Sequence, residues 1–299
     1  MTMTGVFAPI PTPFTESGEL DLSGWRRNVE RWMSTPLHGV VVLGTNGEAP
    51  LVDDAEADQL IEAARARVPS DRRLIAGTGR QSTRATIGAS KRAAAAGADA
   101  VLVRTPSVFK SQLTTSAFIA HYSAVADASP VPVILYNFTA FTGLTLPVQA
   151  VATLATHGNI IGIKESGPDM SYVGDLVETA SAEFSVLVGS APTFFTSLML
   201  GAQGGVLALA SVAPEACVQI YELVLAGRHK EARALQRHVI PLAKLVTSVY
   251  GIPGLKAALA EVGYVGGVPR PPLTPATDTA ISQIRQAIER LTLHTDTVI

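Results

Sequence analysis

Short apolar runs alternate with longer segments of helical periodicity along most of this 299-residue chain. The runs are rich in Val, Ile and Leu and are apolar on both faces, which is typical of parallel strands covered by helices. Strand and helix patterns that strictly alternate in this way favour a closed (β/α)₈ TIM barrel, and an open Rossmann-type sheet is the alternative. The eight runs begin at Gly5, Gly39, Arg73, Ala98, Val131, Asn159, Phe184 and Gly204.

Only helical patterns follow the eighth run, so the end of the chain differs from the rest. A Pro- and Gly-rich stretch at residues 266–275 predicts a connector between two of these helices. We therefore predict a TIM barrel over residues 1–226 and a C-terminal helical extension over residues 227–299.

The composition is that of a globular protein with a sizeable core, because 47% of the residues are hydrophobic and 16% are charged. A formal net charge of -2 predicts neither nucleic acid nor an anionic membrane as a partner. The N-terminus lacks the pattern of a signal peptide, and no apolar run reaches the roughly 18 residues of a membrane span. The single cysteine, Cys217, suits a reducing compartment and is expected to pack in the core. We expect a cytoplasmic protein.

In a barrel of this kind the active site lies at the C-terminal ends of the strands, so the polar residues that close the apolar runs are the candidates. Lys164 stands out among them, because it ends a run of apolar residues whereas the other lysines fall in helical or loop segments of mixed polarity. These candidates are Thr12, the segment 44–48, Thr78, Thr105, Tyr136, Asn137, Lys164, Glu165, Ser166, Ser190 and Ser211.

The position of Lys164 suggests a nucleophile. Loss of hydration in the barrel disfavours an ammonium ion, and a neutral amine is the form that attacks a carbonyl carbon. The alternative is a structural lysine paired with a neighbouring carboxylate such as Glu165 or Glu48. Tyr136 ends the preceding run, so its phenol can approach Lys164 and transfer protons there, unless it is only a packed aromatic ring.

The segment Gly44-Thr45-Asn46-Gly47-Glu48 follows the second run. Its glycines permit a tight turn that directs backbone amides at an anion, which suits a substrate carboxylate. It lacks the length and the lysine of a P-loop. An ordinary turn, with Glu48 capping its amides, is the alternative.

Other classes of site have little support in the sequence. The six histidines neither cluster nor fall at the ends of the apolar runs, so we predict no metal site. No Gly-x-Ser-x-Gly elbow and no dinucleotide-binding fingerprint is present.

Several motifs resemble those of the dihydrodipicolinate synthase / N-acetylneuraminate lyase family, and the resemblance covers essentially the whole chain. It implies a class I aldolase barrel, in which Lys164 condenses with pyruvate and Tyr136 handles protons. We assign Thr45 to catalysis as well as to binding. The resemblance implies no metal or organic cofactor and a homo-oligomer, either a tetramer or a dimer. The motifs are PIPTPF, GTNGE, GADAVLVRTP, YN, IGIKES and YGIPGLKAAL.

The predicted substrate-binding residues lie at the ends of three runs and in the loops that follow two others. The resemblance places the pyruvate carboxylate on the turn of Thr45 and Asn46. The full predicted set is Thr45, Asn46, Gly47, Val108, Phe141, Ser190 and Leu207.

Two of these positions depart from the family's pattern. Phe141 stands where family members that make dihydrodipicolinate carry an arginine for the second substrate's carboxylate, so we expect poor use of aspartate semialdehyde. Val108 stands where many members carry a tyrosine that joins the neighbouring subunit's proton relay. Both residues would also suit a less polar aldehyde.

Within the family, runs such as GTNGEAP and TGLTLP are most similar to 4-hydroxy-2-oxoglutarate aldolase, which releases pyruvate and glyoxylate. We therefore predict cleavage or formation of a 4-hydroxy-2-oxo acid. The alternatives are a dihydrodipicolinate synthase, a 2-keto-3-deoxy sugar-acid dehydratase or aldolase, and a catalytically silent homologue that binds a 2-oxo acid.

Overall fold

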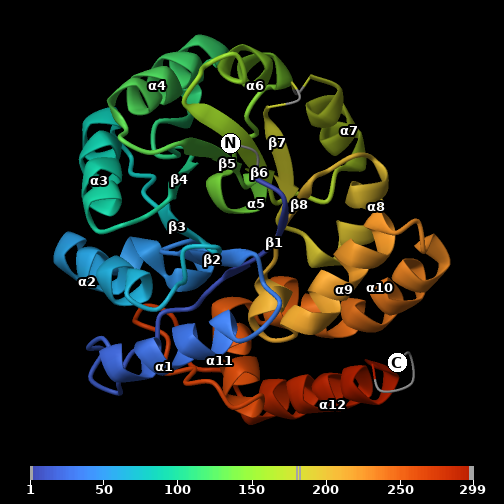
Figure 1. The fold of residues 1–299 in the computed structure, drawn as a ribbon. Helices are drawn as coiled ribbons and strands as arrows, with labels where there is room; N and C mark the ends of the chain where they lie inside the picture. The colour runs from blue at the N-terminus through green and yellow to red at the C-terminus, as the bar shows by residue number, and fades with distance from the viewer. Residues whose placement is uncertain (1–2, 180, 182, 296–299) are drawn as a thin grey trace.

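A computed structural model describes residues 3–179, 181 and 183–295, and its centre is a closed barrel of eight parallel strands in sequence order (Figure 1). Each predicted run contains one strand. The pairing of β1 with β8, at Gly5 and Gly204, closes the sheet, so the TIM barrel is confirmed and the open sheet is wrong. The strands are β1 (Gly5–Pro9), β2 (Gly39–Val42), β3 (Arg73–Gly77), β4 (Ala100–Arg104), β5 (Val133–Asn137), β6 (Ile160–Glu165), β7 (Ser185–Val188) and β8 (Gly204–Val206).

Helices surround the barrel in a ring (Figure 1). Short 3₁₀ turns follow four of the strands: η1 (Thr45–Gly47) and η2 (Ala49–Leu51) after β2, η3 (Lys110–Gln112) after β4, η4 (Ala191–Thr193) after β7 and η5 (Ala208–Ser211) after β8. The ring helices are α1 (Leu22–Met33), α2 (Asp54–Arg65), α3 (Thr83–Ala95), α4 (Thr115–Ala128), α5 (Thr139–Thr142), α6 (Val148–Leu154), α7 (Met170–Thr179), α8 (Phe194–Met199) and α9 (Pro214–Leu225).

Further helices follow α9 and pack on one side of the barrel, next to α1 and α9 (Figure 1). They are α10 (His229–Lys244), the π-helical turn η6 (Leu245–Val249), α11 (Gly251–Glu261) and α12 (Asp278–Thr295). The helical end of the chain agrees with expectation, and the boundary after residue 226 stays a prediction. Within the described ranges, no helix is both long and apolar enough to cross a bilayer.

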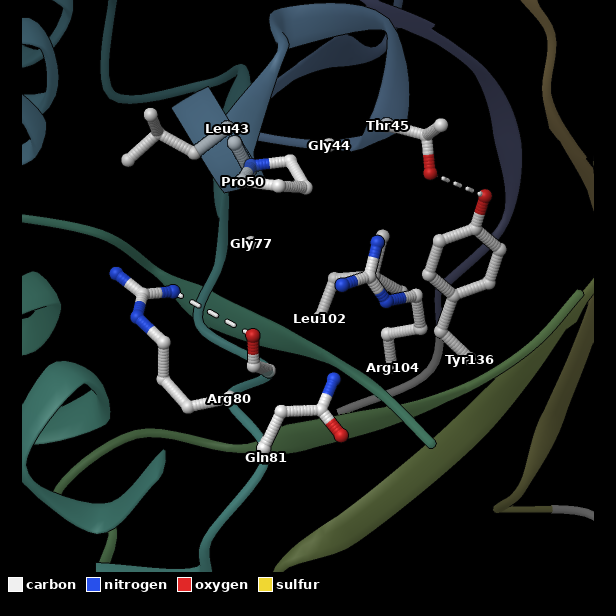
Figure 2. A pocket seen from close by; sticks show the side chains of 12 residues that line it. Leu43, Gly44, Thr45, Pro50, Gly77, Arg80, Gln81, Leu102, Arg104 and Tyr136 are labelled. Atoms are coloured by element: carbon white, nitrogen blue, oxygen red, sulfur yellow. Dashed lines mark hydrogen bonds between the residues drawn. The ribbon is translucent and has the colours of Figure 1, made fainter. Parts of the chain in front are cut away.

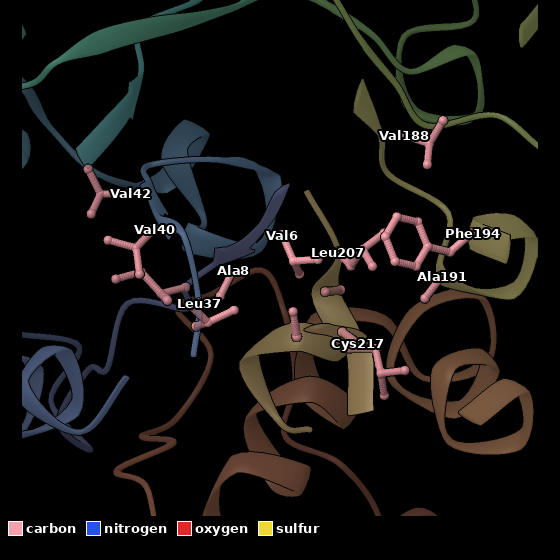
Figure 3. Close-up of a cluster of buried hydrophobic side chains, with 14 of the residues drawn as sticks. Val6, Ala8, Leu37, Val40, Val42, Val188, Ala191, Phe194, Leu207 and Cys217 are labelled. Atoms are coloured by element: carbon pink, nitrogen blue, oxygen red, sulfur yellow. The ribbon is translucent and has the colours of Figure 1, made fainter. Parts of the chain in front are cut away.

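Alternation along the strands sorts the buried side chains into two clusters. One lies inside the barrel and includes Ile75, Leu102, Ile134 and Tyr136. The other fills the layer between strands and helices, and Figure 3 shows part of it. Because successive strand residues point to opposite faces, each strand serves both clusters, and its last inward residue lies at the barrel mouth.

The start of α2 illustrates how local sequence sets these elements. The Asp53 carboxylate accepts a hydrogen bond from Glu56 N at 2.8 Å, and Glu56 Oε2 accepts one from Asp53 N at 3.0 Å. This reciprocal capping box satisfies amides that the first turn of a helix leaves unpaired. It also fixes α2 directly after the turns η1 and η2.

Candidate active site

Lys164 and Tyr136 meet at the end of the barrel where β5 and β6 finish. They are direct partners in the strand register. Lys164 Nζ lies 4.3 Å from the centroid of the Tyr136 ring, and the two residues are only 5% and 3% exposed. The predicted approach of the amine and the phenol is therefore present, and the ring shields one side of the amine from water.

The carboxylates that could have paired with Lys164 are engaged elsewhere. Glu165 Oε2 accepts a hydrogen bond from Asn137 Nδ2 at 2.6 Å, and its other oxygen accepts one from Gly167 N. Glu48 forms an ion pair with Lys256 at 2.5 Å. In the part of the chain that the structure describes, no carboxylate oxygen lies within 4.0 Å of Lys164 Nζ. Lys164 is thus buried without the counter-ion that a structural lysine needs.

Lys256 corrects one of the sequence inferences. The sequence pattern places Lys256 among the lysines in segments of mixed polarity, but this residue is 2% exposed and lies inside the fold. Its Nζ also donates to Val268 O at 2.7 Å and lies 4.6 Å from the centroid of the Phe14 ring. Helical periodicity did not distinguish Lys256 from a surface lysine, because its partner Glu48 is distant in sequence.

Glu165 belongs to a set of hydrogen bonds at the ends of β5 and β6, next to Tyr136 and Lys164. Its pKa is raised by burial, although the hydrogen bonds from Asn137 and Gly167 act in the opposite direction. Asn137 Oδ1 in turn accepts from Leu146 N at 2.8 Å. This chain of bonds joins the ends of β5 and β6 and fixes the strand positions that carry Tyr136 and Lys164.

Thr45 is the third member of the group. Its Oγ1 lies 3.2 Å from the Tyr136 hydroxyl, within hydrogen-bond distance (Figure 2). Residues Leu43 and Glu48, on either side of the turn, have φ values of 56° and 57°. Left-handed backbone is costly for side chains other than glycine and tends to occur at functional sites. The fold therefore holds this turn in a demanding conformation beside Tyr136.

The hydrogen bonds of the turn decide which of its amides can meet an anion. Gly47 N donates to Gly44 O at 3.0 Å, and Glu48 N donates to Thr45 O at 3.1 Å. The amides of Thr45 and Asn46 begin the 3₁₀ turn and have no acceptor within it. The side chains of Thr45 and Asn46 are partly exposed, whereas Gly47 is buried. Gly47 N is therefore engaged inside the turn, and only the amides of Thr45 and Asn46 are left there to meet an anion.

A cavity of about 170 Å³ opens beside Thr45 and Tyr136 (Figure 2). Lys164 is not among its lining residues, and its amine lies against the ring of Tyr136, which is one of them. Arg80, Gln81 and Arg104 also line the cavity. Sequence reasoning missed these three, although Arg104 closes the fourth apolar run and carried the same signal as Tyr136 and Lys164.

Phe141 and Val108 are exposed near this end of the barrel, at 62% and 63%. The Phe141 ring packs on Phe138 at 4.5 Å between centroids, and Phe138 stacks on Tyr136 at 6.0 Å. Val108 N donates to Gln81 Oε1 at 3.1 Å. The rings of Phe141 and Phe138 therefore form a path from the surface to Tyr136. Phe141 occupies the position at which the family resemblance implies an arginine.

The remaining predicted residues lie at the ends of β7 and β8. Ser190 is partly buried, and its carbonyl accepts from Thr193 N at 3.3 Å, which starts η4. The Leu207 side chain is 0% exposed and belongs to the cluster between strands and helices, near Phe194 (Figure 3). Core packing accounts for the Leu207 side chain, and a substrate-binding role for this residue stays a prediction.

Among the described residues, no group of three or more His, Cys, Asp or Glu side chains is placed to hold a metal ion. Cys217 is buried at 1% exposure, as expected, and burial raises the pKa of its thiol. An uncharged thiol is a poor nucleophile, so Cys217 is not a competing reactive group.

Comparison with protein families identifies the group to which this chain belongs. The model of the dihydrodipicolinate synthetase family matches residues 2–291. The chain belongs to this family. A 4-hydroxy-tetrahydrodipicolinate synthase from Exiguobacterium sp. is 37% identical over 288 residues, which cover 96% of this chain and 97% of the relative. Family membership supports a class I aldolase or lyase function at the level of the family.

Other members of the dihydrodipicolinate synthetase family are similar in sequence or structure. A probable mitochondrial 4-hydroxy-2-oxoglutarate aldolase from Emericella nidulans is 34% identical, and the match covers 95% of this chain and 93% of the relative. The structure of a 4-hydroxy-tetrahydrodipicolinate synthase from Methylacidiphilum fumariolicum has a TM-score of 0.94 at 29% identity. The match covers 99% of this chain and 98% of the synthase chain. A prophage protein of the family from E. coli K12, in complex with pyruvate, has a TM-score of 0.91 at 28% identity, covering 98% and 100%.

Proposed function

We propose that this protein is a Schiff-base-forming aldolase or lyase that converts a 4-hydroxy-2-oxo acid to pyruvate and an aldehyde, or catalyses the reverse reaction. The observation that carries the proposal is the position of Lys164 Nζ, which is buried 4.3 Å from the centroid of the Tyr136 ring with no carboxylate partner among the residues that the structure describes. A lysine amine held in this way beside a phenol is suited to attack a carbonyl carbon and form an imine.

The reaction begins when the lone pair of Lys164 Nζ attacks the C2 carbonyl carbon of the 2-oxo acid. The carbonyl oxygen takes up protons and leaves as water, which forms the protonated imine. Tyr136 supplies and removes these protons, and the Thr45 hydroxyl, 3.2 Å from its phenol, passes them on.

The protonated imine then accepts electrons from the bond that breaks. The C4 hydroxyl loses its proton, the C3–C4 bond cleaves to release the aldehyde, and the electron pair forms an enamine between C3 and C2. Protonation at C3 and hydrolysis of the imine by water release pyruvate and restore the amine. No metal or organic cofactor is needed at any of these steps.

The substrate's C1 carboxylate would bind the amides of Thr45 and Asn46, which begin the η1 turn without acceptors inside it. Successive backbone amides without acceptors can donate hydrogen bonds to a carboxylate. This places C2 next to Tyr136, because Thr45 is already in contact with its hydroxyl.

The choice of a 4-hydroxy-2-oxo acid has two supports. The relative from Emericella nidulans carries the name of a 4-hydroxy-2-oxoglutarate aldolase at 34% identity. Phe141 is an exposed apolar ring and provides no guanidinium for aspartate semialdehyde. A synthase is the second candidate, since several relatives of similar identity carry that name. A 2-keto-3-deoxy acid dehydratase would instead yield a dehydrated 2-oxo acid.

Trapping the imine tests the proposal. Incubation with pyruvate and borohydride, followed by peptide mass spectrometry, should find the reduced adduct on Lys164 in the natural protein. Lys164→Met should form none, whereas Lys230→Met, which removes an exposed lysine on α10, should react normally. The absence of an adduct on Lys164 in the natural protein would reject the Schiff-base mechanism.

A coupled assay then separates the substrates. Lactate dehydrogenase and NADH report pyruvate released from a panel of 4-hydroxy-2-oxo acids. An adduct without turnover of any compound would indicate a silent homologue that only binds 2-oxo acids.

We further propose a cytoplasmic homo-oligomer, a tetramer or a dimer. Val108 and its neighbour Phe109, which is 73% exposed, are apolar surface that an interface would cover.

A further inference from the structure

Arg104 occupies the last inward position of β4, directly beside Tyr136. Ala100 and Leu102 belong to the cluster inside the barrel, whereas Val101 and Val103 belong to the outer cluster. Continued alternation directs Arg104 inward. The strand register pairs Arg104 with Tyr136, and both residues line the same cavity (Figure 2).

The guanidinium of Arg104 has no anionic partner within the described part of the chain. The ion pairs found there leave Arg104 out, and so do the side-chain hydrogen bonds. Arg80, the other arginine of the cavity, differs in this respect. Its Nη2 lies 3.2 Å from Asp54 Oδ1, so its charge is already compensated. Arg104 is therefore the cation of this cavity that can accept a ligand's negative charge.

The proposed imine and the Arg104 side chain flank Tyr136 from its two neighbouring strands. Lys164 is on β6, Tyr136 on β5 and Arg104 on β4. Two strand spacings separate the Lys164 and Arg104 backbones by roughly 10 Å, and both side chains are long. A short carbon chain fits between the two cationic ends. The cavity of about 170 Å³ is lined by Arg104 and Tyr136 but not by Lys164, so it can hold the carboxylate end of such a chain.

We propose that Arg104 binds the second carboxylate of a five-carbon 2-oxo dicarboxylic acid whose C2 carbon reacts at Lys164. This inference rests on the proposed function and specifies its substrate class. The first carboxylate is assigned to the amides of Thr45 and Asn46, so the guanidinium is left for C5. A planar guanidinium forms two parallel hydrogen bonds with a carboxylate. A methyl group in place of that carboxylate offers no acceptor to the guanidinium. Arg104 thus selects a dianionic acid over a monoanionic acid of the same length.

Two substrates that differ only at C5 test the selection. Pyruvate release is measured from 4-hydroxy-2-oxoglutarate and from 4-hydroxy-2-oxopentanoate, in which a methyl group replaces the C5 carboxylate. The natural protein should prefer the dicarboxylate. Arg104→Gln should lower kcat/KM for the dicarboxylate by about 10- to 100-fold, the usual range for loss of a charge-assisted hydrogen bond. Its kcat/KM for the pentanoate should change less than about threefold, and Arg104→Lys should recover part of the loss.

Arg80→Gln is the matched control. It removes the other guanidinium of the cavity, the one paired with Asp54, and should leave the preference between the two substrates unchanged. Equal losses for both substrates in Arg104→Gln would overturn the proposal. So would loss of the pyruvate adduct in that variant, because Arg104 would then bind the C1 carboxylate or support the fold.

Equilibrium binding keeps this test separate from the proposed chemistry. Calorimetry with 2-oxoglutarate and with 2-oxopentanoate, on the natural protein and on Lys164→Met, needs no turnover. A preference for 2-oxoglutarate that disappears in Arg104→Gln supports the role of Arg104 even if no compound is cleaved. An unchanged preference in that variant overturns it, whether or not Lys164 forms an imine.

Discussion

Glu48 and Lys256 form a buried ion pair of 2.5 Å between the turn that follows β2 and helix α11 of the C-terminal end. The side chains of Lys256 and Glu48 are 2% and 0% exposed. Burial lowers the pKa of Lys256, and the neighbouring Glu48 opposes that change. Glu48 Oε2 also accepts from Arg270 N at 2.8 Å. Because Glu48 directly follows the Thr45 turn, the C-terminal helices support the candidate active site.

Removal of one partner of this pair should be more damaging than removal of both. Lys256→Met leaves a buried carboxylate without its counter-ion, which typically costs about 3–5 kcal/mol of unfolding free energy. Glu48→Gln combined with Lys256→Met removes both charges and keeps an acceptor for Arg270 N, so most of the loss should be recovered. Urea denaturation of the two single variants and the double variant measures the coupling. Additive losses would show that the pair does not act as a unit.

Tyr136→Phe should separate the two roles of the tyrosine. The variant keeps the ring beside Lys164 Nζ and removes the hydroxyl that lies 3.2 Å from Thr45 Oγ1. We expect kcat to fall by about 10²- to 10⁴-fold, the usual contribution of general acid-base catalysis. Thr45→Val should cause a smaller loss, because the phenol remains. Stopped-flow measurement of imine formation checks both. A Tyr136→Phe enzyme of normal kcat would contradict the proton-transfer role.

Phe141→Arg should broaden the range of aldehydes. The new guanidinium would stand at the edge of the site, where it can pair with the carboxylate of aspartate semialdehyde. Condensation of this aldehyde with pyruvate should rise by at least about tenfold, which is the effect of roughly 1.4 kcal/mol of new binding. Phe141 is 62% exposed, so stability should stay within about 0.5 kcal/mol. Phe141→Leu is the control, since it adds no charge and should show no such gain.

His121 on α4 should make the fold sensitive to acid. Burial lowers its pKa from 6.5 to about 4, and its Nδ1 lies 2.9 Å from Thr83 Oγ1. Between these two pH values the unfolded chain binds a proton that the folded chain does not, so stability falls as the pH drops from about 6.5 to about 4. One pKa unit corresponds to about 1.4 kcal/mol, so the loss amounts to about 3 kcal/mol.

The measurement for His121 is urea denaturation at a series of pH values. His121→Gln should lose about 3 kcal/mol less than the natural protein between pH 6.5 and pH 4. His229→Gln replaces an exposed histidine and should follow the natural protein. Parallel pH profiles for all three proteins would show that His121 is not the group responsible.

Local sequence was sufficient for most of the barrel. Each strand is predicted by a short run of residues that is apolar on both faces. The order of the runs also predicts that Tyr136 and Lys164, at the ends of consecutive strands, are neighbours. The register confirms this, with the two residues directly paired. Capping residues such as Asp53 also act on their own helix and are readable from the sequence. These features depend on residues that are close in the chain or on adjacent strands.

Contacts between distant segments decided the rest. The β1 and β8 pairing that closes the barrel joins Gly5 to Gly204, and the pairing of Lys256 with Glu48 crosses from α11 to the turn after β2. Leu207 follows a strand like the other candidates, yet its side chain packs in the outer core.

The sequence by itself therefore determined the eight strands, their order and the proximity of Lys164 and Tyr136. Only the tertiary structure decided that, among the residues it describes, no carboxylate pairs with Lys164 or with the Arg104 guanidinium in the cavity beside Tyr136. The physical reason is that hydrophobic periodicity reports which side of an element is buried. The charge balance of a buried side chain depends on which distant groups the closed barrel brings within a few ångströms of it.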